Sequence, residues 1–311
     1  NGIKSGTAMD DRDASLTIRE LTLNIEALVN DAINAEQRLK VESGNLTIAA
    51  GEDAIHCDME LNIGAEGTTG PAITVSTCCE GLEGAVLNIH SGNMDITSTD
   101  DCLNAANSDL GDYAFEINIS GGTIKAYSSG GDGFDSNGTL TITGGDISVW
   151  TANAADNQPL DADGRITISG GTVLAAGGSA GMGFSISASQ PYVTFGGGRD
   201  SSLSLAGGAA FSIADESGKS VLDSTALCDA AFLFYSSPAL TAEGRYSVQS
   251  TVTATAKTGE ADTQFGGNGG SGGSGGQRPD GMTPPDGQMP QGQLPQSDGT
   301  TPPELPAASS N

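Results

Sequence analysis

Oxygen-bearing side chains recur at fixed offsets through the first half of this chain. Residues 53–58, 80–85, 101–106 and 132–137 read DAIHCD, EGLEGA, DCLNAA and DGFDSN, with an acidic residue first, an apolar residue third and a polar residue fourth. Carboxylate and amide oxygens are the ligands that the hard cation Ca²⁺ takes, about six to eight at a time. If these stretches stack on one another, their spacing indicates cation-binding chemistry along one edge.

The stretches open seven repeats, which begin at Asn1, Asp31, Asp53, Glu80, Asp101, Asp132 and Gln158. The third residue of each repeat is apolar and is expected to point inward, so strand alternation places the fourth and sixth residues outside. The first, fourth and sixth positions supply the candidate calcium ligands, which are Asp31, Asp53, Asp58, Glu80, Glu83, Asp101, Asn104, Asp132, Asp135, Asp161 and Asp163.

Stacking would place like charges about 5 Å apart on neighbouring strands, which is unfavourable. After Lys4, no Lys or Arg occupies any of the three positions, so a bound cation is expected to neutralise the row. The alternative is a hydrated acidic edge in which some Asp side chains cap turns. Two calcium clusters are expected, one from Glu80, Glu83, Asp101 and Asn104 and the other from Asp132, Asp135, Asp161 and Asp163.

Strands and tight turns must position these side chains. Strands such as LTI (140–142) and ITI (166–168) are followed by a Gly pair and then by DISVW (146–150) or TVLAA (172–176). Apolar residues alternate with Thr, Ser or Asn, which is the pattern of half-buried strands, and the Gly pairs mark corners. Three short strands per repeat predict coils of a parallel β-helix, because each unit buries its apolar strip only by stacking. A β-sandwich would not explain the repeated opening motif.

Three segments are expected. Residues 1–181 form the β-helix repeats, right-handed because parallel crossover connections almost always are. Residues 182–258 lack the opening motif and hold most of the Phe and Tyr, so they predict a last coil and a C-terminal antiparallel β cap over the open end. Residues 259–311 are rich in Gly, Pro and Gln and are expected to form a disordered linker or tail. The predicted class is all-β, a right-handed parallel β-helix with that cap.

Composition excludes several classes of partner. Asp and Glu number 39 against 12 Lys and Arg, which gives a net charge of −27. This argues against nucleic acid and anionic lipid and suits a cation binder on an extracellular surface. No apolar run approaches the ~18 residues of a membrane span. The chain begins without Met or a signal peptide, as expected of a mature or trimmed fragment. Five irregularly spaced cysteines predict no disulfide framework. Cys57 and Cys102 are expected to be small buried residues, and pairing with Cys78 or Cys79 is the alternative.

Several motifs together resemble a known family. They are DDCLNAA, EGLEGA with LNIHSGNMDIT, GDGFDSNGTLTITGG, LDADGRITISGGTVLAAG, and SSP followed by YSV. Over roughly residues 1–258 the chain resembles the bacterial family described as carbohydrate-binding domain-containing protein. The resemblance implies a right-handed parallel β-helix that binds calcium. It also implies a polysaccharide partner, either acidic pectic glycan (polygalacturonate) or a cellulose-like glucan, and we expect a secreted or cell-surface protein.

Three functions remain open at this stage. A non-catalytic module would align an extended polysaccharide on a long β face, with Trp150 and Tyr127 as aromatic contacts. A calcium-dependent pectate lyase would need a base for the C5 proton beside the metal, and Arg165, just beyond Asp161 and Asp163, is the candidate. Paired carboxylates also serve glycoside hydrolases, although an acidic row supplies such pairs by accident. A structural or adhesive cell-surface spacer would bind no small ligand. The module is favoured.

Overall fold

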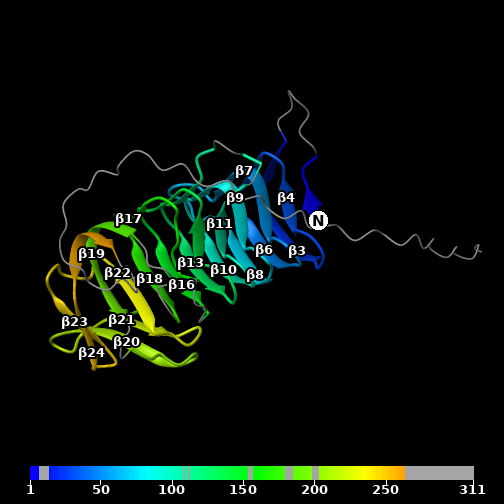
Figure 1. The fold of residues 1–311 in the computed structure, drawn as a ribbon. Coiled ribbons are helices and arrows are strands. Elements are labelled where there is room, and N and C mark those ends of the chain that lie inside the picture. Colours follow the sequence, from blue (N-terminus) through cyan, green and yellow to red (C-terminus); the bar gives the residue numbers. More distant parts are fainter. Residues whose placement is uncertain are drawn as a thin grey trace, which may run out of the picture. The chain divides into compact units, whose positions relative to one another are not determined.

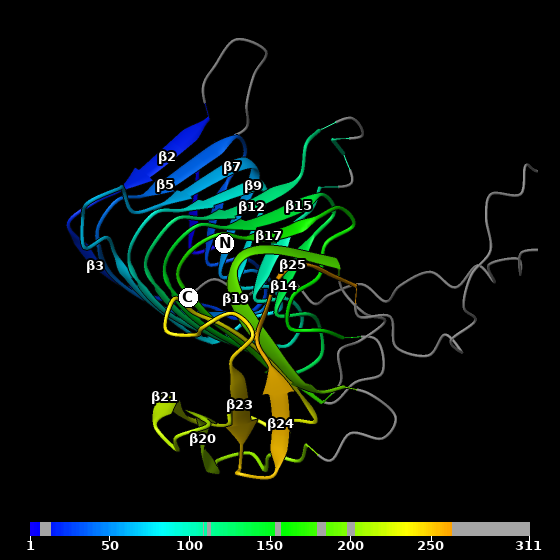
Figure 2. The same cartoon turned by 90° about the vertical axis from the view of Figure 1, so that its left-hand side faces the viewer.

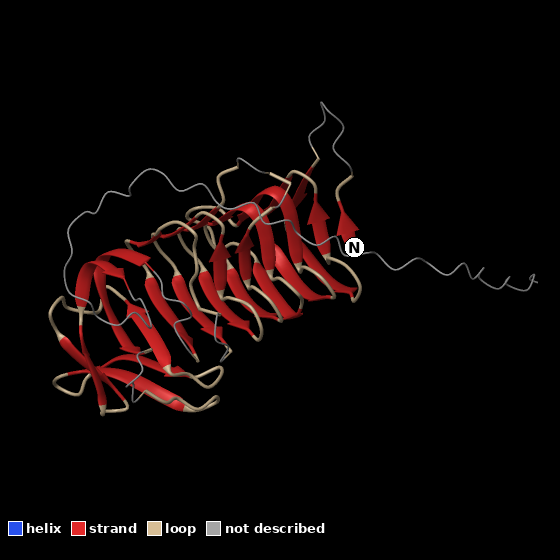
Figure 3. Ribbon diagram, in the orientation of Figure 1, coloured by secondary structure: helices blue, strands red, loops and turns tan. Residues whose placement is uncertain are grey.

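The computed structural model of the chain describes residues 1–6, 14–107, 109–110, 113–152, 157–178, 185–197 and 203–262. Every regular element in these residues is a β-strand (Figure 3). A search of the same residues for a helix that could span a membrane found none. The part of the predicted tail after residue 262 lies outside the described residues, as does the predicted boundary at residue 181.

The strands stack as three parallel walls, with one strand of each wall in nearly every coil. Figure 1 shows strands of the third wall side by side, and Figure 2 shows those of the second. The first wall consists of β1 (Ile3–Lys4), β4 (Ile33–Ala35), the starts of β7 (Ile55–Ile63) and β9 (Leu82–Ile89), β11 (Leu103–Ala105) and β14 (Phe134–Ser136).

The other two walls complete each coil. The second wall consists of β2 (Ser15–Ile18), β5 (Arg38–Val41), the ends of β7 and β9, β12 (Glu116–Ile119), β15 (Thr139–Ile142), β17 (Ile166–Ile168) and the start of β19 (Ser185–Gly196). The third wall consists of β3 (Leu21–Ala27), β6 (Gly44–Ala50), β8 (Ala72–Thr77), β10 (Asn93–Ser98), β13 (Thr123–Ser128), β16 (Asp146–Thr151) and β18 (Thr172–Gly177).

The third residues of the repeats stack inside the coils as predicted. Ile33, Ile55, Leu82, Leu103 and Phe134 are Cα partners on successive coils and are fully buried. They belong to one apolar core that runs along the inside of the solenoid. The register therefore confirms the predicted alignment of the repeats, and with it the all-β parallel solenoid.

Small residues allow the corners and the core to pack closely. Gly145 and Gly171, the second residues of two Gly pairs, have φ angles of 95° and 79°, a left-handed conformation that favours glycine. Cys57 and Cys102 are fully buried, as predicted, and both are free. The other three cysteines are free as well.

The solenoid ends in antiparallel strands, which confirms the predicted cap. Strand β22 (Phe232–Ser236) pairs antiparallel with β18 and β19, and β25 (Lys257–Asp262) pairs antiparallel with β19 and continues beyond the predicted tail boundary at residue 258. A separate sheet has the order β21-β20-β23-β24, with β20 (Ala210–Asp215), β21 (Ser220–Thr225), β23 (Arg245–Val248) and β24 (Val252–Thr255).

Candidate functional site: an acidic ladder

The polar fourth residues of the repeats form one row on the outside of the first wall. Cα pairing places six of them in register, and the bridge from Phe134 to Leu160 extends the row by one coil. The row reads Lys4, Asn34, His56, Glu83, Asn104, Asp135 and Asp161. We call this row, together with the first residues of the repeats, the acidic ladder.

The first residues have a structural role in the ladder. One Asp101 carboxylate oxygen accepts the backbone N–H of Asp132 at 2.6 Å, and Asp132 in turn accepts the N–H of Gln158 at 2.5 Å. Asp31 accepts the N–H of Asp53 at 3.4 Å in the same way. Each carboxylate thus satisfies a donor of the following coil, while its second oxygen does not take part in this bond.

Three carboxylates meet on the sixth and seventh coils. Asp132, Asp135 and Asp161 each offer one oxygen, and these oxygens lie within 4.8 Å of one another. Burial raises the pKa of Asp132 to about 7 and that of Asp135 to about 6, and the charge of Asp161 adds to both shifts. Among the described residues, no Lys, Arg or His forms an ion pair with this cluster.

Two buried carboxamide oxygens beside this cluster have no hydrogen-bond partner. They are Asn104 Oδ1, next to Asp135 in its row, and Gln158 Oε1, next to Asp132 in the row of first residues. Their side chains are only 7% and 2% exposed, and a buried acceptor without a partner costs about 1–3 kcal/mol. Carboxylate and amide oxygens without nitrogen or sulfur are a donor set for a hard divalent cation, so these residues fit calcium.

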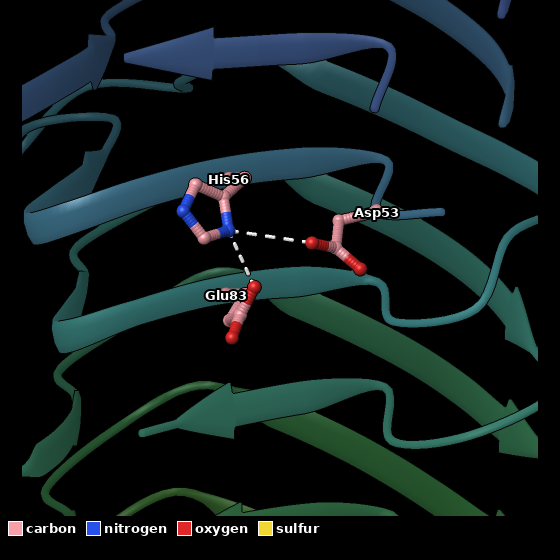
Figure 4. A group of neighbouring side chains, drawn as sticks. All are labelled: Asp53, His56 and Glu83. Carbon is pink, nitrogen blue, oxygen red and sulfur yellow. Dashed lines mark hydrogen bonds and ion pairs between the residues drawn. The ribbon is translucent and has the colours of Figure 1, made fainter. Parts of the chain in front are cut away.

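A second cluster, on the third and fourth coils, contains a histidine that sequence reasoning overlooked (Figure 4). His56 Nδ1 faces Asp53 Oδ2 at 3.3 Å and forms a short contact with Glu83 Oε2, while Nε2 lies 3.0 Å from Asp58 Oδ1. Burial alone would lower the pKa of His56, but hydrogen bonds to Asp53 and Glu83 raise it to about 11. The visible signal is the histidine at the fourth position of DAIHCD, where the other repeats after Lys4 have an acidic residue or Asn.

The structure assembles the second predicted cluster more fully than the first. Asp163 is exposed and lies outside the three-carboxylate group, although its charge raises the pKa of Asp135. In the first predicted cluster, Glu80 accepts a hydrogen bond from Asn104 Nδ2 at 3.0 Å, whereas Glu83 turns to His56 on the preceding coil. Burial raises the pKa of Glu80 to about 7. The expected four-residue group is therefore divided.

The expectation that the sixth residues point outward holds for most repeats, since Glu36 contacts Lys4 and Asp58 contacts His56, but Ala85 is an exception. Asp58 falls in a register irregularity of β7 between Cys57 and Glu60, and Ala85, its counterpart on the next coil, is fully buried. Ala85 lies at the corner between the first and second walls, where strict alternation of the side chains ends. Asp58 contacts His56 and not the sixth residue of a neighbouring coil.

Trp150 is fully buried, so it does not provide the expected aromatic contact for a sugar. Its side chain extends from the outer face of β16, but the cap covers the ring, and the residue is 0% exposed. It packs against Phe211 with the ring centroids 6.0 Å apart and the planes at 70°, and its Nε1 donates to Ser148 Oγ. Tyr127, its Cα partner on β13, is half-buried at the edge of the same apolar cluster. A sugar ring can therefore reach Tyr127 but not Trp150.

Arg165, the candidate base of a lyase, has a partner in the structure. Its Nη1 donates to Glu260 Oε1 of β25 at 2.7 Å, and both side chains are exposed. The guanidinium thus forms an ion pair with the antiparallel strand that follows the solenoid, and it forms none with Asp161 or Asp163.

A row of amides on the second wall also escaped sequence reasoning. Asn62, Asn88 and Asn118 are Cα partners on β7, β9 and β12. Asn88 Nδ2 donates to Asn62 Oδ1 at 3.3 Å, and Asn118 Nδ2 donates to Asn88 Oδ1 at 3.2 Å. The repeated letters LNI, LNI and INI at 61–63, 87–89 and 117–119 were its signal. The row presents amides at the spacing of the coils.

The fold and the ladder define a parallel β-solenoid with an acidic, partly buried edge. A family model described as carbohydrate-binding domain-containing protein matches residues 1–181. The chain belongs to this family, and its partner class is carbohydrate. A search of curated proteins and a search of solved structures each found no match.

Proposed function

We propose that the chain is a non-catalytic module that binds acidic plant cell-wall polysaccharide through calcium held at Asp132, Asp135 and Asp161. The observation that supports this most directly is the convergence of three carboxylates within 4.8 Å beside the unpartnered oxygen of Asn104. Asp101 completes the acidic surroundings, since burial raises its pKa to about 8 and the charges of Asp132 and Asp135 add to this shift. A divalent cation would relieve all of these unfavourable interactions together.

Charge explains why a cation is needed for an acidic glycan. The protein carries a net charge of −27, and polygalacturonate carries a carboxylate on each sugar. Two polyanions repel each other at long range, so direct binding of uronate to this edge is unfavourable. Calcium takes about six to eight oxygens, and the protein side chains named here provide fewer. The remaining positions are open to uronate carboxylates and water.

The row of Asn62, Asn88 and Asn118 supports a second part of the proposal, the binding of an uncharged glucan. Asn62, Asn88 and Asn118 donate to one another and to Glu60 and Glu116. They thus form an ordered polar row at one-coil intervals, which suits the hydroxyls of an extended cellulose-like glucan. This contact would not require calcium. Polygalacturonate and glucan binding should therefore separate in their response to a chelator. A secreted or cell-surface location belongs to the proposal, because plant cell-wall polysaccharide lies outside cells.

Binding of polygalacturonate and of cellulose, each with and without chelator, tests the proposal. Polygalacturonate should be retained in the presence of calcium and released by chelation. Asp135→Asn should lower the affinity for polygalacturonate about tenfold or more, equivalent to ~1.4 kcal/mol. The matched control is Asp223→Asn, an exposed acid on β21 of the cap. Retention of polygalacturonate in chelator at the same affinity would contradict the calcium bridge. Loss of all glycan binding on a broad array would favour a structural spacer.

A further inference from the structure

The two three-residue clusters occupy the same positions of the repeat. Asp53 and His56 are the first and fourth residues of the third coil, and Glu83 is the fourth residue of the next coil. Asp132, Asp135 and Asp161 hold the corresponding positions on the sixth and seventh coils. In both clusters one atom from each side chain lies within 4.8 Å of the others. The clusters differ in chemistry at the fourth position, where a histidine replaces an aspartate.

Hydrogen-bond geometry indicates a charged form of His56. Nδ1 faces Asp53 Oδ2 at 3.3 Å and also contacts Glu83, while Nε2 lies 3.0 Å from Asp58 Oδ1. An ionised carboxylate only accepts hydrogen bonds, and only the protonated imidazole donates from both nitrogens. The arrangement is satisfied when the ring is an imidazolium surrounded by three carboxylates. With the ring in this form, the cluster contains its own positive charge.

Unpartnered oxygens separate the two clusters further. The buried acceptors without a partner, Asn104 Oδ1 and Gln158 Oε1, belong to the fifth and seventh coils. In the cluster around His56, Asp53 and Glu83 are both within contact distance of the ring. In this part of the ladder, a protein side chain provides the positively polarised partner that the carboxylate oxygens need. In the later coils, two buried oxygens have no such partner.

We propose that His56 is a built-in counter-ion that fills, between the third and fourth coils, the place that calcium takes between the sixth and seventh. This inference rests on the proposed calcium site and specifies where the ladder binds metal. His56 is a specificity-determining residue in this sense, because it directs calcium to the C-terminal part of the ladder. The amino acid at the fourth position of a coil then decides whether that coil is neutralised by protein or by metal.

Reciprocal substitutions test this inference by counting calcium ions. His56→Asp reproduces the acidic set of the later coils and should add one calcium per chain in titration calorimetry of dialysed protein. Asp135→His introduces the imidazole at the equivalent position and should remove one calcium. The His56→Asp protein should also show a larger fall in melting temperature on chelation than the wild type, while Asp135→His should show a smaller one.

The outcomes distinguish this inference from the proposed function. If the wild type binds no calcium, the proposed calcium bridge fails. If the wild type binds calcium and folded His56→Asp gains none, only the counter-ion inference fails. Should His56→Asp not fold, an unchanged calcium count in Asp135→His overturns the inference instead. Zinc binding to the wild type that is lost in His56→Gln would also overturn it, because Nδ1 would then be a metal ligand.

Discussion

Asp101 and Asp132 are joined across two coils, with Asp101 Oδ1 accepting the backbone N–H of Asp132 at 2.6 Å. Despite this bond, burial raises the pKa of Asp101 to about 8 and that of Asp132 to about 7. An Asp in an unfolded chain has a pKa of about 3.9. Without metal, the ladder therefore holds these two carboxylates in an environment that disfavours their charged form.

The first prediction concerns pH. A carboxyl group whose pKa is raised on folding contributes stability below its unfolded pKa, and this contribution is lost as pH rises through the folded pKa. The melting temperature of calcium-free protein should therefore fall from about pH 4 to about pH 9, through the range set by Asp135, Asp132 and Asp101. Thermal denaturation of dialysed protein across this range measures it.

Removing one shifted carboxyl provides the control, because general self-repulsion also grows with pH. Asp132→Asn should flatten the pH dependence, whereas Asp223→Asn on the cap should leave it unchanged. Equal slopes in the two variants would show that the ladder is not its source.

The second prediction concerns metal. Calcium at 100 times its dissociation constant should stabilise the fold by about 2.7 kcal/mol per site, a rise in melting temperature on the order of 5–10 °C for a chain of this size. The effect should be larger at pH 8 than at pH 5, because calcium binds the ionised carboxylates. Sodium at equal ionic strength should not reproduce it. An unchanged melting temperature, with no heat of calcium binding, would leave the ladder a hydrated acidic edge.

The third prediction concerns Trp150, the single tryptophan of the chain. Its fluorescence should be blue-shifted, weakly quenched by acrylamide and unchanged by saturating polygalacturonate, because the cap covers the ring. Trp150→Ala should destabilise the fold by about 3–5 kcal/mol, the usual cost of deleting a buried Trp. A clear spectral shift on adding glycan would mean that the ring is a sugar contact after all.

The fourth prediction concerns catalysis. Arg165 pairs with Glu260, so Arg165→Ala should leave glycan binding unchanged, and the wild type should not convert polygalacturonate to unsaturated products. Absorbance of such products during incubation with calcium measures this directly. Calcium-dependent turnover that disappears in Arg165→Ala would identify the chain as a lyase and Arg165 as its base.

The sequence by itself determined the coils and their register. The apolar third residues, from Ile33 to Leu160, recur once per repeat, and a solenoid buries them only when like positions stack, so local pattern and global fold agree. The same stacking brought Asp132, Asp135 and Asp161 together. The repeat pattern could not predict which neighbouring coil a polar side chain turns toward. Whether Glu83 turns toward His56 on one side or toward Asp101 on the other depends on hydrogen bonds and charges in three dimensions.

Only the tertiary structure determined that Trp150 is buried and that Asp58 contacts His56. Trp150 is covered by Phe211 and other cap residues that lie far along the chain, and no local pattern encodes such a contact. Asp58 lies where β7 has a register irregularity at the corner between two walls, and its contact with His56 of the same coil could not be read from the repeat pattern. Periodic positions were predictable because they repeat, and corners and long-range contacts were not because they occur once.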